Sequence, residues 1–192
     1  MSQHQVLEST RLQLRPLETS DEDSIVEFMS ERKVTEFLLH FGYPICREQV
    51  RSWLNNVLSA TPEQCGYWAL VDKESGRLIG VICLTLDSYN RKGEIGYWMA
   101  KNYWGRGLMT EATWRVAQYC FDTLKLHRLE LTHMVANKAS QRVSEKVGFQ
   151  LEGCWREGHW KDGQFKDVKI YGMLAVDYER ARKRFAAVDP VE

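Results

Sequence analysis

The sequence of 192 residues has no excess of charge of either sign, because 26 Lys and Arg residues balance 26 Asp and Glu residues. Proteins that bind polynucleotides normally carry a basic excess, so no nucleic-acid partner is expected. No apolar run reaches the roughly 18 residues of a membrane-spanning helix, so no membrane span is expected. The first residues, Met-Ser-Gln-His-Gln, lack the apolar stretch of a secretion signal, so no signal peptide is expected either.

Signals for disulfides and metal ions are also missing. The five cysteines form no Cys-x-x-Cys pair, their number is odd, and several lie in apolar runs. This pattern indicates reduced thiols and a cytoplasmic protein. The five histidines show no His-Glu-x-x-His motif and no paired spacing, so no metal site is expected. Cys120 is predicted to lie on the core face of a helix, which argues against a nucleophilic role.

The stretch from Tyr103 to Thr113 carries the strongest functional signal. Gly105 and Gly107 precede a run in which apolar residues recur at every fourth position, namely Ala112, Val116, Cys120 and Leu124. Glycine allows positive φ and a close approach of backbone to a ligand. A helix N-terminus adds unpaired N–H groups and a partial positive charge. Together they predict a pyrophosphate site, to which Arg106 adds a charge and Thr110 a hydroxyl.

Three interpretations of this loop can be compared. A P-loop would need Gly-x-x-x-x-Gly-Lys-Ser/Thr, and a Rossmann turn would need Gly-x-Gly-x-x-Gly, where position 110 is Thr. The run from Trp104 to Met109 instead resembles the acyl-CoA loop Gln/Arg-x-x-Gly-x-Gly/Ala of the GCN5-related N-acetyltransferases. It departs from that signature at Trp104 and Met109. Tryptophan at the first position resembles the branch that acetylates the N-termini of ribosomal proteins. A plain glycine turn before a core helix remains the alternative.

A second stretch, Val135 to Phe149, resembles another block of the same family. It reads as the end of a strand, Asn-x-x-Ser, a helix and then Gly-Phe. The likeness continues in Leu151-Glu-Gly-Cys154 and in the later Asp-Gly turn, and begins with the alternating strand at residues 11–15. The resemblance therefore covers nearly the whole chain.

The resemblance implies one N-acetyltransferase domain over residues 1–192, with an ordered core at about 10–186. The fold it implies is of the α/β (α+β) class, with a mixed, mostly antiparallel sheet of about seven strands, helices on both faces, and splayed strands that form an acetyl-CoA cleft. Periodicity places strands at 11–15, 67–71, 78–86, 94–100 and 128–135, with a hairpin over 149–160 and 167–176. It places helices at 47–58, after Gly107, at 138–147 and from Asp177. Phe37 to Phe41 is either a short helix or a loop over the substrate.

The resemblance implies how acetyl-CoA binds. Pantetheine would lie in the gap between the splayed strands and pair with the backbone of Trp98 and Met99. Asn137 would meet the pantetheine arm. The loop would hold the pyrophosphate through Gly105, Arg106, Gly107, Leu108, Met109 and Thr110. Core packing is the alternative role for the side chains of Trp98 and Met99.

The implied reaction is attack of an amine on the acetyl thioester, which needs a neutral amine and a stabilised leaving thiolate. Glu94, which opens the strand along the thioester, and His159, in the later hairpin, are the candidate bases; each is also explained as a solvated strand residue. Glu157, two residues before His159, is a substitute. Ser140 of Asn-x-x-Ser matches the serine proposed as the thiolate's partner, or it simply bonds backbone. Many relatives use a tyrosine where this chain has Ser144.

The predicted activity is transfer of acetyl from acetyl-CoA to a primary amine, with a protein N-terminus, such as that of a ribosomal protein, as the favoured acceptor. Two alternatives stay open: a small amine acceptor such as a polyamine, an amino sugar or a drug, and a non-catalytic acyl-CoA-binding module. The sequence also leaves a homodimer open.

Overall fold

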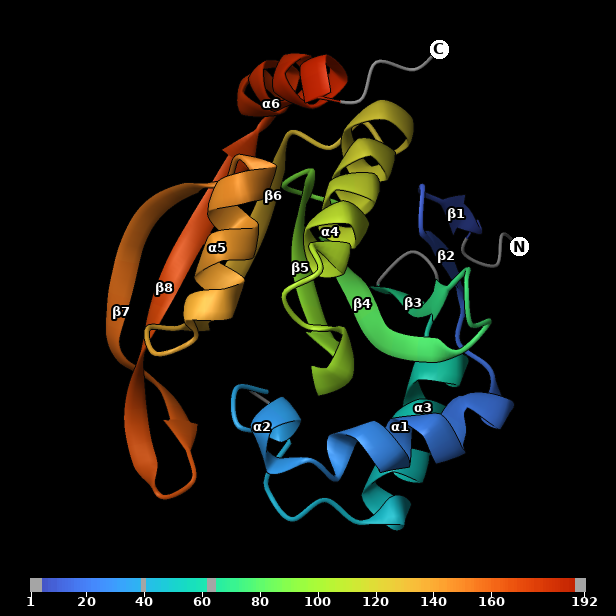
Figure 1. Cartoon of the computed structure of the whole chain (residues 1–192). Coiled ribbons are helices and arrows are strands. Elements are labelled where there is room, and N and C mark those ends of the chain that lie inside the picture. Colours follow the sequence, from blue (N-terminus) through green and yellow to red (C-terminus); the bar gives the residue numbers. More distant parts are fainter. Residues whose placement is uncertain (1–4, 39–40, 62–64, 189–192) are drawn as a thin grey trace.

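The computed structural model describes residues 5–38, 41–61 and 65–188. Among these residues eight strands form one sheet in the order β1-β2-β3-β4-β5-β6-β8-β7 (Figure 1). The strands are β1 (Leu7–Glu8), β2 (Leu12–Pro16), β3 (Cys65–Asp72), β4 (Leu78–Asp87), β5 (Lys92–Met99), β6 (Arg128–Met134), β7 (Gln150–Lys161) and β8 (Gln164–Leu174). Only β5 and β6 pair in parallel within this described sheet. The mixed, mostly antiparallel sheet is confirmed, with one more strand than the expected seven or so.

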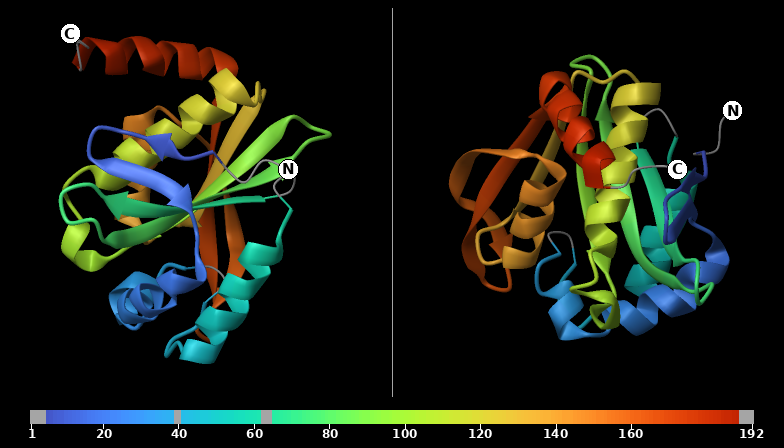
Figure 2. Two further views of the ribbon diagram at one scale, coloured as in Figure 1. Left: turned by 90° about the vertical axis from the view of Figure 1, so that its right-hand side faces the viewer. Right: turned by 45° about the horizontal axis from the view of Figure 1, so that its top comes forward.

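Helices cover both faces of the sheet. They are α1 (Glu22–Met29), α2 (Arg32–Thr35), α3 (Arg47–Ser59), α4 (Leu108–Gln118), α5 (Lys138–Val147) and α6 (Ala175–Val188). In Figure 1 α4 and α5 lie in front of the sheet, and Figure 2 shows α6 at the end of the molecule opposite α1 and α3.

Strand alternation divides the core into two clusters. On β3, Trp68 and Leu70 join the cluster under α4 and α5, whereas Ala69 between them joins the cluster under α1 and α3. The middle strand β4 is buried on both faces, as its continuous apolar run predicts.

The strands β5 and β6 separate shortly after they meet. Their parallel pairing is limited to Lys92↔Arg128, Gly93↔Leu129 and Glu94↔Glu130. Beyond that point β5 stays with β4 and β6 stays with β8. The facing backbone edges of residues 95–99 and 131–134 therefore have no ladder between them. This gap is the splayed-strand arrangement expected from the sequence.

Element ends differ from the prediction in small ways. The helix after Gly107 changes to a π-helical turn at Tyr119–Thr123, which still buries Cys120 in the core. The strand β8 starts three residues before the predicted Asp167, and α6 starts two before the predicted Asp177. Phe37 lies in a turn after α2, while Leu39 and His40 of the ambiguous segment lie outside the described residues. In the part of the chain that the structure describes, no helix is long and apolar enough to cross a membrane.

His133 on β6 is expected to make the free energy of unfolding depend on pH. Burial lowers its pKa from the ordinary value; nearby Lys138 and Lys169 act in the same direction, and Glu145 and the backbone of Met134 oppose them. Its Nδ1 lies 2.9 Å from the Met134 carbonyl oxygen, and its Nε2 is buried without a partner in the described residues.

Because the folded pKa is below the unfolded one, the stabilisation is complete above about pH 6.5 and is lost as the pH falls through the folded pKa. We expect the free energy of unfolding in urea to fall more steeply below that pH in the wild type than in His133→Asn. Parallel curves for the two proteins would contradict this prediction.

Candidate active site

The glycine loop adopts the backbone conformation that its sequence predicts. Gly105 and Gly107 both have φ of +77°, in the left-handed region where L-residues are strained. Gly107 occupies the N-cap position of α4, and no side chain caps the first turn. Arg11, the residue before β2, braces the loop by donating to the Arg106 carbonyl oxygen and to the carboxylate of Glu111. The free N–H groups of α4 are thereby held at the surface of a cavity.

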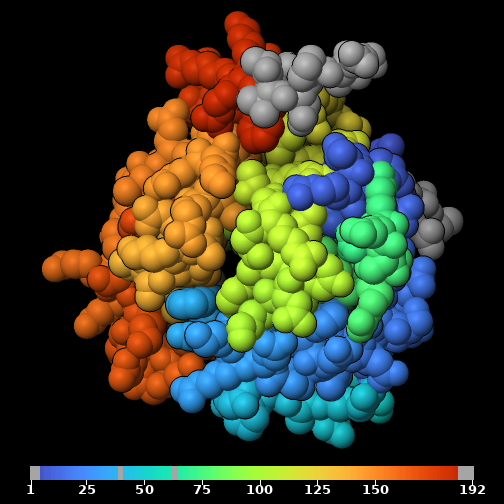
Figure 3. Space-filling model, in the orientation of Figure 1, coloured from blue at the N-terminus to red at the C-terminus, as the bar shows by residue number. Residues whose placement is uncertain are grey.

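This cavity has a volume of about 300 Å³ and lies where β5 and β6 separate. Figure 3 shows a hollow between α2, the start of α4 and α5. Its walls include most of the predicted acetyl-CoA residues, namely Trp98, Met99, Gly105, Gly107, Leu108, Met109, Thr110 and Asn137, and also the candidate catalytic residue Ser140. Arg106 is not in this lining, and its guanidinium carbon lies over the Tyr103 ring, 5.3 Å from the centroid. Basic side chains that the sequence did not single out, Arg142 and Lys146 of α5, also line the cavity.

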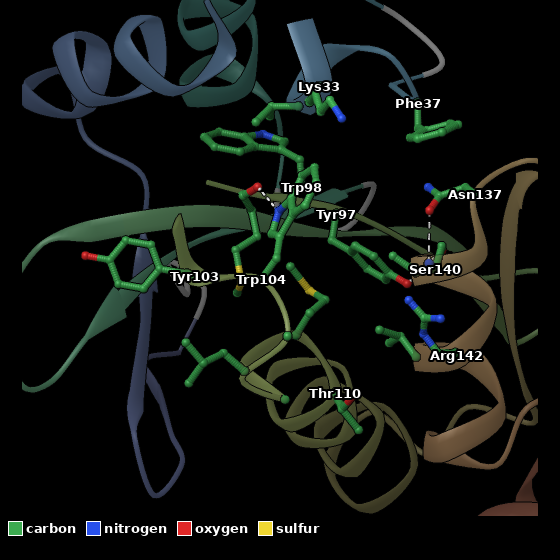
Figure 4. Close-up of a pocket in the computed structure, with 18 of the residues that line it drawn as sticks. Lys33, Phe37, Tyr97, Trp98, Tyr103, Trp104, Thr110, Asn137, Ser140 and Arg142 are labelled. Atoms are coloured by element: carbon green, nitrogen blue, oxygen red, sulfur yellow. Dashed lines mark hydrogen bonds between the residues drawn. The ribbon is translucent and has the colours of Figure 1, made fainter. Parts of the chain in front are cut away.

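Trp104, the first departure from the family signature, ties the loop to β5. Its indole Nε1 donates to the carbonyl oxygen of Met99 over 2.7 Å (Figure 4). The residue was noticed in the sequence as a replacement, but nothing in the pattern indicated this bond. It engages one of the backbone groups at the end of β5 where pantetheine was expected to pair.

Ser140 lies in the first turn of α5. The Asn137 side chain caps this helix, as expected, by accepting a hydrogen bond from the Ser140 N–H over 3.0 Å. The Ser140 hydroxyl lies 2.8 Å from the hydroxyl of Tyr97 on β5. Ser144, in contrast, donates its hydroxyl to the Ser140 carbonyl oxygen. The role of bonding backbone, which the sequence left open for Ser140, therefore falls to Ser144.

The candidate bases lie in different places. Glu94 is exposed at the last β5–β6 pair and accepts a hydrogen bond from the Thr132 hydroxyl over 2.8 Å. Strand alternation puts it on the face of the sheet opposite to Tyr97. His159 is half-buried on β7 opposite Lys166 and, like Glu94, does not line the cavity.

Glu157 lies in a β-bulge. The β7–β8 register shifts between Trp155 and His159, and Glu157 has φ of +52° with its N–H donating to Asp167. The bulge interrupts the alternation that would place Glu157 and His159 on one strand face. Of the two, Glu157 lines a groove between α2 and the β7–β8 hairpin.

The profile of the acetyltransferase (GNAT) domain family matches residues 11–150, which include the glycine loop, the splayed strands and α5. The chain belongs to the GNAT acetyltransferases. It is therefore an acetyl-CoA-dependent acetyltransferase that acts on an amine acceptor. The non-catalytic module is thereby disfavoured.

Several relatives can be compared with this GNAT acetyltransferase. Bacillus subtilis YdaF, named as a ribosomal N-acetyltransferase, is 40% identical over 105 residues, which are 54% of this chain and 57% of YdaF. Bacillus subtilis YoaA, named as an N-acetyltransferase, is 30% identical over 173 residues, which are 88% of this chain and 96% of YoaA. A structure of RimL, a ribosomal L7/L12 α-N-protein acetyltransferase with coenzyme A, has a TM-score of 0.80 at 22% identity and covers 88% of this chain and 98% of that one. The similarity to the RimL structure supports the fold.

Acetyl-CoA fits the observed cavity. Two left-handed glycines and an uncapped helix N-terminus suit the pyrophosphate, and the unpaired edge of β5 suits the amide groups of pantetheine. In the described residues no group of three or more His, Cys, Asp or Glu side chains could hold a metal ion.

A groove between α2 and the β7–β8 hairpin adjoins the cavity of the GNAT acetyltransferase. The two share Lys33 and Phe37 in their walls. Lys161 of the hairpin is buried and donates its ammonium to the carbonyl oxygens of Thr35 at 3.2 Å, Leu38 at 2.9 Å, and Phe41. Burial lowers the pKa of this ammonium. Lys161 thus holds the segment after α2 in place beside both the cavity and the groove.

Replacing Lys161 by methionine is expected to destabilise the protein by about 1–3 kcal/mol, because buried carbonyl groups lose their donor while the apolar stem remains. Urea unfolding measures this loss. Amide hydrogen exchange at residues 35–38 should also accelerate. Lys166→Met is the control, since its ammonium bonds only the Gln164 side chain in the described structure. Unchanged amide hydrogen exchange at residues 35–38 in Lys161→Met would show that Lys161 does not hold this segment in place.

Proposed function

We propose that this GNAT enzyme acetylates the N-terminal α-amine of a protein, such as a ribosomal protein, in the cytoplasm. The observation that carries the proposal is the mixed charge of the groove that joins the cavity. Its cations are Arg32, Lys33, Lys138, Lys161 and Lys166, and its anions are Glu36, Glu157, Asp162 and Asp167. A peptide offers an ammonium, carbonyl groups and side chains of either sign, which suit such a lining. A polyamine carries only positive charge, so it would pair with the anions of the groove but leave the cations without a partner.

The energetics of deprotonation also support an α-amine. With a pKa near 8, an α-amine costs about 1 kcal/mol to deprotonate at pH 7, whereas a lysine side chain costs about 4.6 kcal/mol. The described residues near the gap offer single carboxylates rather than a strong base. The names of YdaF and RimL, which refer to ribosomal proteins, add support by similarity.

The proposal can be tested with purified enzyme, isotopically labelled acetyl-CoA, a ribosomal extract and a pool of small amines. Mass spectrometry then locates the label. Label on a protein N-terminus supports the proposal and names the acceptor. Label confined to a polyamine or amino sugar would replace it with the small-amine alternative. Enzyme inactivated by heat is the control for chemical acetylation.

A further inference from the structure

Two hydroxyl groups meet across the gap between the splayed elements. Tyr97 comes from β5, three residues beyond the last β5–β6 pair, and Ser140 comes from the first turn of α5. Their oxygen atoms are 2.8 Å apart, and both residues line the acetyl-CoA cavity. Figure 4 shows the two side chains pointing toward one another.

Both groups are held in place. The Tyr97 ring packs against the core cluster under α4 and α5. Ser140 is 6% exposed, and the Asn137 cap fixes the turn that carries it. Packing of the Tyr97 ring and the cap of the α5 turn therefore hold the two hydroxyl groups near one another.

The pair contains one hydrogen more than its own contact uses. Each hydroxyl carries one hydrogen, and only one of the two lies between the oxygens. In residues 5–38, 41–61 and 65–188, neither oxygen has a second hydrogen-bonding partner. When Tyr97 donates to Ser140, the Ser140 hydrogen is free to point into the cavity. The pair then presents one oriented donor to a ligand.

This donor is suited to stabilising an anion rather than to giving up a proton. A thiol has an ordinary pKa of about 8.5 and a tyrosine one of about 10. Burial raises the pKa of Tyr97 further. Transfer of a proton from Tyr97 to a thiolate is therefore uphill, whereas a hydrogen bond to the charged sulfur is favourable.

We propose that Tyr97 is a positioning residue for acetyl transfer, whose hydroxyl donates to Ser140 and turns the Ser140 hydrogen toward the sulfur of coenzyme A. In the reaction the C–N bond forms, the C–S bond breaks and its electron pair goes to sulfur. The proton of the amine leaves to a base or to water, and the hydroxyl pair keeps both of its own hydrogens. The inference rests on the proposed role of Ser140 as the thiolate's partner.

The test measures the thiol pKa of bound coenzyme A from the ultraviolet absorbance of its thiolate across pH. We expect a bound pKa about one unit below that of free coenzyme A, as a charge-assisted hydrogen bond gives. Tyr97→Phe and Ser140→Ala should each remove most of that difference. The double variant should go no further than Ser140→Ala, because both substitutions act on the same donor to sulfur, the Ser140 hydroxyl. Coenzyme A affinity measured below the thiol pKa should stay near the wild-type value, which a general loss of packing would not allow.

Tyr119→Phe is the matched control, since it removes a hydroxyl from a partly buried tyrosine outside the cavity. It should leave the thiol pKa of bound coenzyme A unchanged. The inference would be overturned by a thiol pKa of bound coenzyme A that is the same in the wild type as in free coenzyme A. It would also be overturned by a wild-type thiol pKa in Tyr97→Phe, or by additive shifts of this pKa in the double variant. The measurement needs no acceptor, so it tests Tyr97 even if the acceptor is not a protein N-terminus.

Discussion

Replacing Gly107 by valine is expected to weaken acetyl-CoA binding by at least about tenfold, which corresponds to 1.4 kcal/mol. Gly107 has φ of +77°, a conformation that costs an L-residue about 1–2 kcal/mol and a β-branched residue more. Relief of this strain would rotate the peptide that opens α4. The N–H groups of the first turn would then no longer converge on the pyrophosphate.

The side chain itself is a smaller part of this effect. A Cβ at Gly107 would meet only the Arg11 guanidinium, at 3.7 Å. The loss therefore arises mainly from the altered backbone of the loop. Isothermal titration with acetyl-CoA measures it.

Gly76→Val is a matched control for the strain. Gly76 has φ of +68° in the turn between β3 and β4, and a Cβ there would meet nothing within 4 Å. This variant should lose stability in urea but keep its acetyl-CoA affinity. Equal acetyl-CoA affinities for Gly107→Val and the wild type would show that the loop is not part of the acetyl-CoA site.

The parts of the site that could be predicted from sequence depend on local chemistry. Gly105 and Gly107 fit a left-handed turn that few other residues tolerate, so their spacing before an apolar period fixes both the loop and the start of α4. Asn137 is a preferred N-cap residue, and it caps α5 where expected. These features need only a few neighbouring residues to be recognised.

The parts that could not be predicted depend on distant contacts. Tyr97 and Ser140 are 43 positions apart, and Lys161 is 126 positions from Thr35. A tyrosine in an apolar strand and a lysine at a hairpin tip both look ordinary in sequence. The bulge around Glu157 also leaves no period to detect, and β1 has only two residues, too few for alternation to show.

The residue that accepts the amine proton gives the largest expected change in rate. We propose Glu94, because it lies where β5 and β6 separate, on the face opposite to Tyr97 of the same strand. Glutamine at position 94 keeps an acceptor for the Thr132 hydroxyl, so the local structure should persist. With a general base removed, kcat should fall by about 10²-fold, and the acid limb of its pH profile should flatten.

The pH dependence of the Glu94→Gln defect also reports on the acceptor. As the amine loses its own proton, the need for a base disappears, so the defect should narrow above about pH 8 for an α-amine and only above about pH 10 for a lysine side chain. In comparison, Glu157→Gln should mainly raise KM for the acceptor, since Glu157 lines the groove, and His159→Gln should stay near the wild type. A rate loss in His159→Gln with none in Glu94→Gln would transfer the role of base to the hairpin, and a full rate in all three variants would leave the amine proton to water.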